Sequence, residues 1–152
     1  MEYEVVDLKE KIVVGLCART NNNAPDMGMV IGGLWQRFYQ NGIHDAIKNR
    51  KNEKALGIYT DYAGNEMDDY TAEVGCEVTA AKDLPGGTVT TVIPAGRYAR
   101  FVVKGDMQKA VAEFWMQLWK LNLNRSFCCD FEEYQDCEEE NATIHIYIGL
   151  AV

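Results

Sequence analysis

A short segment near the C-terminus, Asp130-Phe131-Glu132-Glu133-Tyr134, combines carboxylates with aromatic residues in a pattern that could do chemistry. Side chains alternate between the two faces of a strand, so Glu132 and Tyr134 share one face, and Phe131 and Glu133 share the other. One glutamate must face the interior, where a carboxylate is costly unless a partner satisfies it. A carboxylate placed in this way suits cation recognition or acid–base chemistry. If Phe131 is a core residue, Glu133 points inward, unless a β-bulge shifts the register.

The chain is rich in aromatic residues but has fewer basic than acidic residues. The tryptophans fall in predicted helices and most tyrosines in predicted strands: Trp35, Trp115 and Trp119, and Tyr59, Tyr62, Tyr70, Tyr98, Tyr134 and Tyr147. Core and cross-strand packing accounts for most such rings. The alternative is a cage, because each aromatic face attracts a cation by roughly 0.5–2 kcal/mol. Combined with a carboxylate, such a cage selects flat, positively charged ligands.

Composition and charge exclude several classes of function. Fifteen basic against 23 acidic residues in a chain of 152 give a net charge of −8, which disfavours nucleic acid and anionic membrane surfaces as partners. No apolar run approaches the ~20 residues of a membrane-spanning helix, and the acidic N-terminus lacks the basic start of a secretory signal. Two histidines and no glycine-rich phosphate loop predict neither a metal site nor a cofactor. We expect a cytoplasmic protein.

Two predicted helices carry the same apolar pattern. The first spans Met27–Gln40 and the second spans Met107–Leu121, with Asp106 as its N-cap. Their apolar stripes superpose at a constant offset of 80 residues, which places Trp35 on Trp115. The chain therefore contains one pattern twice.

The segments around the helices repeat as well. Strand candidates are residues 4–20, 57–62 and 70–78 in the first half and 88–104, 129–134 and 144–152 in the second, with 88–104 interrupted at residues 94–96. A turn at residues 83–87 separates two β-α-β-β halves, about 1–83 and 87–152. Neither half can close a core alone, so we predict one α+β domain over residues 1–152. Both helices should cover one face of a shared antiparallel sheet, with a cleft between the halves.

Five stretches in this order resemble the GyrI-like, or AraC-type, effector-binding domain family, in particular its stand-alone branch associated with bacterial integron cassettes. They are Ile31–Phe38, Gly57–Tyr62, Tyr70–Val78, Ile93–Phe101 and Asp130–Tyr134. The resemblance implies two SHS2-like modules around a multidrug-binding cleft that takes small cationic or amphipathic molecules, in the service of transcription regulation or drug sensing. The chain contains no helix-turn-helix segment, so any regulation would work through a partner.

The resemblance also implies a set of ligand-binding residues. The family pattern of phenylalanine, glutamate, any residue and tyrosine falls on residues 131–134 and selects Glu132 over Glu133. The family tryptophan falls on Trp35, and its strand tyrosines fall on Tyr59 and Tyr98. Trp119 and Tyr147 complete the expected apolar walls.

Two other functions compete with ligand binding. Some relatives are similar to hydrolases of strained cyclic toxins, which would make Glu132 a general base and Trp35 a positioning residue. Others are similar to interaction modules that inhibit a topoisomerase, which would make a protein the partner. An exposed sheet edge would also allow a homodimer.

Overall fold

The predicted repeat is present, and the first strand of the second half is interrupted near Pro94 as predicted, whereas the break in the first strand of the first half was not predicted. The computed structural model describes residues 1–151, so Val152, the end of the last predicted strand, lies outside the described residues. The elements of the first half are β1 (Glu4–Leu8), β2 (Lys11–Thr20), α1 (Met27–Gln40), α2 (Ile43–Ala46), β3 (Ala55–Thr60) and β4 (Tyr70–Val78). Those of the second half are β5 (Val89–Ile93), β6 (Gly96–Gly105), α3 (Met107–Leu118), β7 (Arg125–Tyr134) and β8 (Ala142–Leu150).

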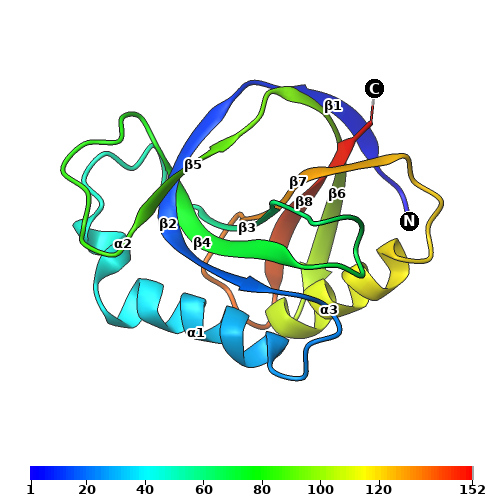
Figure 1. The fold of residues 1–152 in the computed structure, drawn as a ribbon, viewed down its shortest axis with the longest axis horizontal. Coiled ribbons are helices and arrows are strands. Elements are labelled where there is room, and N and C mark those ends of the chain that lie inside the picture. The colour runs from blue at the N-terminus through cyan, green and yellow to red at the C-terminus, as the bar shows by residue number, and fades with distance from the viewer. Residues whose placement is uncertain (152) are drawn as a thin grey trace.

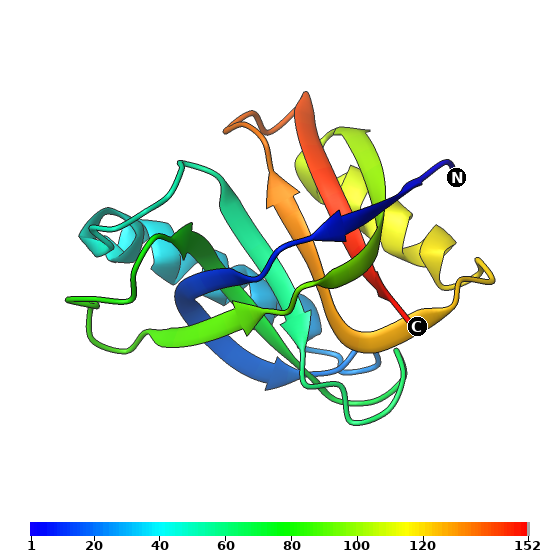
Figure 2. The ribbon, with the colours of Figure 1, turned by 90° about the horizontal axis from the view of Figure 1, so that it is seen from above.

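All eight strands form one antiparallel sheet in the order β1-β6-β8-β7-β3-β4-β2-β5. This order is symmetric about the central pair, β3 of the first half and β7 of the second. The broken strands exchange partners, because β1 pairs with β6 of the other half and β5 pairs with β2. Figures 1 and 2 show both crossovers, which join the halves at their outer edges as well as at the centre.

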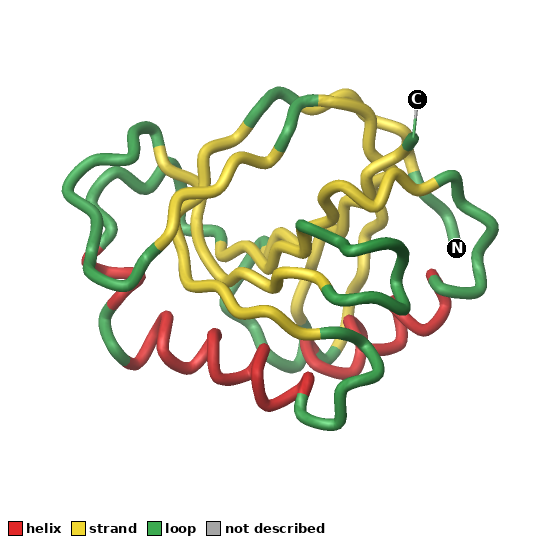
Figure 3. Tube along the Cα trace, viewed as in Figure 1, coloured by secondary structure: helices red, strands yellow, loops and turns green. Residues whose placement is uncertain are grey.

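Both long helices lie on the same face of the sheet, as predicted (Figures 1 and 3). Helix α1 packs on β2 and β4, and α3 packs on β6 and β8. Leu34 and Phe38 of α1 are buried, as are Phe114 and Leu118 of α3, which occupy the same places in the repeat. The central strands β3 and β7 therefore lie between the two helices.

The local sequence explains where the second helix begins and ends. The side chain of Asp106 accepts a hydrogen bond from the Lys109 backbone amide at 3.0 Å, which satisfies one of the free N–H groups of the first turn. The helix ends at Leu118, one turn earlier than the pattern predicted. Within residues 1–151, no helix is both long and apolar enough to span a membrane.

The second face of the sheet also carries a core, which corrects one expectation. Phe131 is fully buried there, packed with Ile58, Tyr98 and Tyr147. The assumption that Phe131 marks the helix-covered face was therefore wrong, because the sheet curls around a second apolar cluster between its edge strands β1 and β5 (Figure 1).

A carboxylate that forms no ion pair within the described residues is buried on that second face. Glu73 of β4 is only 2% exposed, and Thr91 of the edge strand β5 donates a hydrogen bond to its Oε1. Its Oε2 has no partner among the residues that the structure describes. Burial raises the pKa of Glu73 from 4.5 to about 7, the Thr91 hydrogen bond opposes this rise, and the charge of Asp61 adds to it.

Glu73 should therefore make stability depend on pH. Its folded-state pKa lies above the ordinary value, so its contribution is complete below pH 4.5 and is lost as the pH rises to about 7. In Glu73→Gln this loss is absent. Between pH 5 and pH 8, we expect the stability difference between variant and wild type to shift in favour of the variant by up to about 3 kcal/mol.

Urea denaturation at both pH values measures this shift. Glu138→Gln serves as the control, because Glu138 is exposed. A constant stability difference between Glu73→Gln and wild type at both pH values would contradict the assignment.

Candidate functional site

The centre of the sheet places a glycine opposite a glutamate. Gly57 of β3 pairs with Glu132 of β7, on the face between the two helices. A Cβ atom on Gly57 would lie 2.9 Å from Glu132 Oε1 and 3.5 Å from Trp35 Cζ2. The missing side chain thus provides the space in which the carboxylate sits.

Three neutral side chains donate hydrogen bonds to the Glu132 carboxylate. The Tyr59 hydroxyl and the Trp115 indole Nε1 each donate to Oε2 at 2.8 Å, and the Tyr134 hydroxyl donates to Oε1 at 2.8 Å. The donors come from β3, α3 and β7, and Glu132 itself is 1% exposed. Among the described residues, no lysine, arginine or histidine lies within ion-pair distance of it.

The electrostatics of this group reflect its isolation from positive charge. Burial raises the pKa of Glu132, and the hydrogen bonds from Trp115, Tyr134 and Tyr59 oppose that rise. In turn, burial and the neighbouring carboxylate raise the pKa of Tyr59 and Tyr134 well above 10, so both hydroxyls keep their protons. A positive charge from outside would therefore find an acceptor that the protein itself leaves without a counter-charge.

Aromatic rings surround the carboxylate. Trp35 of α1 meets the Tyr134 ring edge-on at 5.0 Å, and Tyr59 meets Trp115 at 5.4 Å and Tyr70 at 5.7 Å. Trp35 packs against the apolar clusters under both helices. We call these five residues, Trp35, Tyr59, Tyr70, Trp115 and Tyr134, the aromatic cage. Its rings could contact a cationic ligand through their faces.

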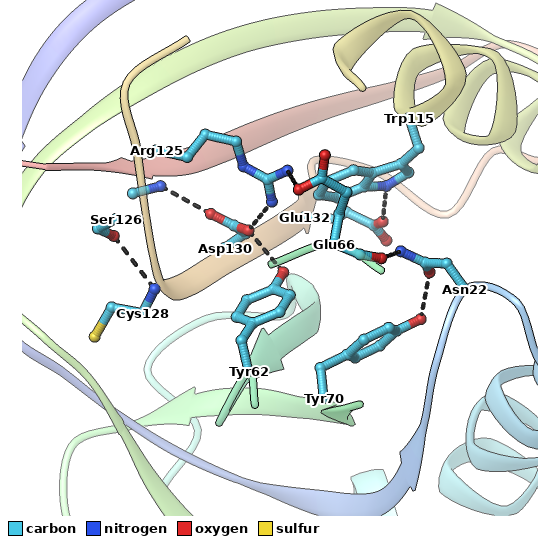
Figure 4. A network of polar contacts seen from close by, with 11 residues as sticks. Asn22, Tyr62, Glu66, Tyr70, Trp115, Arg125, Ser126, Cys128, Asp130 and Glu132 are labelled. Carbon is cyan, nitrogen blue, oxygen red and sulfur yellow. Dashed lines mark hydrogen bonds and ion pairs between the residues drawn. The ribbon is translucent and has the colours of Figure 1, made fainter. Parts of the chain in front are cut away.

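A second buried carboxylate lies two residues earlier on the same strand but has a counter-charge. Asp130 is 0% exposed; its Oδ2 accepts from Arg125 Nη2 and from the Tyr62 hydroxyl, both at 2.7 Å (Figure 4). Its Oδ1 accepts from the Gly149 backbone amide at 2.9 Å. The Arg125 guanidinium also lies over the Phe127 ring, 4.3 Å from its centroid. Asp130 is thus fully satisfied within the protein, whereas Glu132 is not paired with a cation.

The β3–β4 loop connects Asp130 to the segment that precedes α1. Tyr62 reaches Asp130 from this loop, and Glu66 Oε2 lies 4.0 Å from Arg125 Nη1. The Asn22 side chain donates to the Glu66 backbone carbonyl at 2.9 Å and accepts from the Tyr70 hydroxyl at 2.8 Å (Figure 4). This network fixes the loop beside the cage.

The structure brings together three of the six predicted site residues: Glu132, Trp35 and Tyr59. Tyr98 and Tyr147 lie on the other face of the sheet, in the second core. Trp119 caps the C-terminal end of α3 and is 39% exposed. Glu133, the alternative carboxylate, faces away from the helices; its Oε1 lies 3.8 Å from Lys54 Nζ.

The six predicted site residues leave out three members of the cage, Trp115, Tyr134 and Tyr70, which the sequence analysis named only among the rings of a possible cage. The repeat could have predicted Trp115 as a site residue, because Trp115 occupies the position of Trp35 in the second half. Strand alternation could have predicted Tyr134, because it follows Glu132 by two residues and so lies on the same face of the strand. No comparable pattern singles out Tyr70. Over the part of the chain that the structure describes, no cluster of three or more His, Cys, Asp or Glu side chains could hold a metal ion.

Comparison with known proteins places the chain in a family. Residues 4–150 match the family described as Cass2, integron-associated effector binding protein. The chain belongs to this family. It is thus an effector-binding protein by family membership, as the sequence motifs predicted.

Two solved structures have the same fold as this chain over nearly its full length. An integron cassette protein from Vibrio cholerae shares 26% identity and a TM-score of 0.80, covering 98% of this chain and 95% of its own. SAV2435, solved with tetraphenylphosphonium bound, shares 21% identity and a TM-score of 0.79, covering 99% and 94%. YobU of Bacillus subtilis (strain 168), provisionally designated a transcriptional regulator, is 27% identical over 154 residues, covering 96% of each chain.

The two buried carboxylates of β7 should respond differently to neutralisation. In Asp130→Asn the Arg125 charge loses its buried partner and keeps, among the described residues, only Glu66, 4.0 Å away, so we expect a loss of about 3 kcal/mol in unfolding free energy. In Glu132→Gln no cation is stranded, and the amide can still accept from Trp115 and Tyr59 and donate to Tyr134. We expect a loss of about 1 kcal/mol or less. Urea denaturation at pH 7 measures both, and equal losses would contradict the distinction.

Proposed function

We propose that this protein binds lipophilic aromatic cations between α1 and α3, with Glu132 as the counter-charge and the aromatic cage as the apolar walls. The observation that carries the proposal is the buried Glu132 carboxylate, held by three neutral donors and by no cation. A buried charge of this kind gains most from a positive ligand that brings little hydration of its own. SAV2435, which has the same fold, binds such a cation, tetraphenylphosphonium.

The position of the rings implies that ligand entry moves side chains. Trp35 reaches the carboxylate region from α1 and Trp115 from α3, while Glu132 is almost fully buried beneath them. A ligand that contacts Glu132 must displace at least one of these indoles. Because the helices pack on different strands, the rings can separate without breaking either helix–sheet contact.

Titration calorimetry with tetraphenylphosphonium tests the role of Glu132. Wild type should bind the cation, and Glu132→Gln should weaken binding about tenfold or more, which corresponds to about 1.4 kcal/mol. Glu133→Gln is the matched control, since Glu133 faces the other side of the sheet. Triphenylphosphine oxide, a neutral aryl compound, should bind equally weakly to all three proteins. If Glu133→Gln lost as much affinity as Glu132→Gln, or if neither variant lost any, the proposal would fail.

Tryptophan fluorescence tests where the ligand lies. Tetraphenylphosphonium should change the fluorescence of wild type, because Trp35 and Trp115 border the carboxylate. Trp35→Phe and Trp115→Phe should each reduce this change. Trp119→Phe should preserve it, because that ring lies at the exposed end of α3. If the fluorescence change disappeared only in Trp119→Phe, the ligand would bind outside the aromatic cage.

A further inference from the structure

The groups that donate hydrogen bonds to Glu132 are all electrically neutral, and the charged groups near it on the same face of β7, Asp130 and Arg125, form an ion pair with each other. Tyr59 contacts it from β3, Trp115 from α3 and Tyr134 from its own strand, while Tyr70 of β4 packs against the Tyr59 ring. Trp35 of α1 lies nearby, and the paired residue of β8 is an isoleucine. A carboxylate buried without a counter-charge tends to take up a proton rather than remain ionised. Burial is accordingly the dominant influence on its pKa, which it raises against the three hydrogen bonds.

The aromatic cage can also satisfy the protonated form of Glu132. An indole N–H can only donate, so Trp115 fixes Oε2 as an acceptor. A phenolic hydroxyl can donate or accept, and Tyr134 lies 2.8 Å from Oε1. With a proton on Oε1, the Glu132 hydroxyl donates to Tyr134 Oη, and the Tyr134 hydroxyl hydrogen turns elsewhere. Uptake of one proton together with rotation of one hydroxyl thus converts the ionised form into a protonated form in which both carboxyl oxygens keep a hydrogen-bond partner.

We propose that the empty site holds a proton on Glu132 Oε1 and that a cationic ligand binds in exchange for it. This inference rests on the proposed function of the site. The O–H bond of the carboxyl group breaks, the proton leaves to solvent, and the ligand supplies the positive charge that balances the carboxylate. The buried site therefore carries no net charge in either state. Binding of a neutral ligand should leave the proton on Glu132.

Proton exchange makes cation affinity depend on pH. Below the pKa of the empty site, affinity for tetraphenylphosphonium should rise about tenfold per pH unit, and above it affinity should level off. The cation itself does not titrate, so the dependence reports on the protein. In Glu132→Gln, the weaker binding should be independent of pH. Glu133→Gln should retain the wild-type profile.

Calorimetry and infrared spectroscopy together test the exchange. Titration of tetraphenylphosphonium between pH 5 and pH 8, in phosphate and in buffers with larger ionisation enthalpies, counts the protons released per ligand. We expect release to approach one proton where the pH lies below the pKa of the ligand-free site and to fall toward zero above that pKa. At pH 5, the infrared carbonyl band of a protonated carboxyl group should disappear on ligand addition in wild type and be absent from this difference spectrum in Glu132→Gln.

The outcomes separate the two proposals. Tight binding that requires Glu132 but releases no proton at any pH from 5 to 8 would overturn the exchange and leave the binding function intact. Absence of tetraphenylphosphonium binding at every pH, or release that persists in Glu132→Gln, would overturn the assignment of the site to Glu132. Release that disappears in Glu132→Gln and persists in Glu133→Gln supports the exchange.

Discussion

The Glu132 carboxylate, held by three neutral donors, constrains the positions of three separate elements at once. The donor atoms of Tyr59 on β3, Trp115 on α3 and Tyr134 on its own strand, β7, each lie 2.8 Å from one of its oxygens. Each bond compensates part of the desolvation of a group that would otherwise be unsatisfied in the interior. Because the donors are neutral, they satisfy the hydrogen-bonding capacity of the carboxylate but not its charge. The hydrogen bonds of Glu132 therefore contribute to stability, while its charge stays uncompensated within the described residues.

The duplicated architecture explains why such a site forms at the centre of the sheet. Each helix covers the outer strands of its own side, so β3 and β7 meet where neither helix lies directly above them. Equivalent tryptophans, Trp35 and Trp115, then reach this place from opposite sides. The chemistry on the symmetric frame is not symmetric: Trp115 donates to the carboxylate, whereas Trp35 packs edge-on against Tyr134. Gly57, opposite Glu132, provides the remaining space.

Sequence periodicity was sufficient for the helices and the shared sheet, because apolar stripes and strand alternation follow directly from burial on one side. It was insufficient for Phe131, since alternation gives two faces but does not say which one carries the helices when both carry a core. The same ambiguity separates Tyr98 and Tyr147 from Glu132, because they line the second core. Trp115 was recoverable from the repeat alone. Tyr70 depends on how β3 and β4 pair, which no local pattern encodes.

The contrast between Asp130 and Glu132 shows how one strand can combine a fixed anchor with an adaptable site. Asp130 forms a buried ion pair with Arg125 and holds Tyr62, so the β3–β4 loop is tied to β7 by a charged interaction that is costly to break. Glu132 is held only by neutral hydrogen bonds, whose net contributions are about 1 kcal/mol each and whose donors can turn or withdraw. Rearrangement on ligand entry is therefore expected in the rings of the cage and not in the loop beside it. The two carboxylates therefore divide the roles on β7: the charged pair of Asp130 fixes the backbone and the loop, and the neutral bonds of Glu132 leave its surroundings free to rearrange.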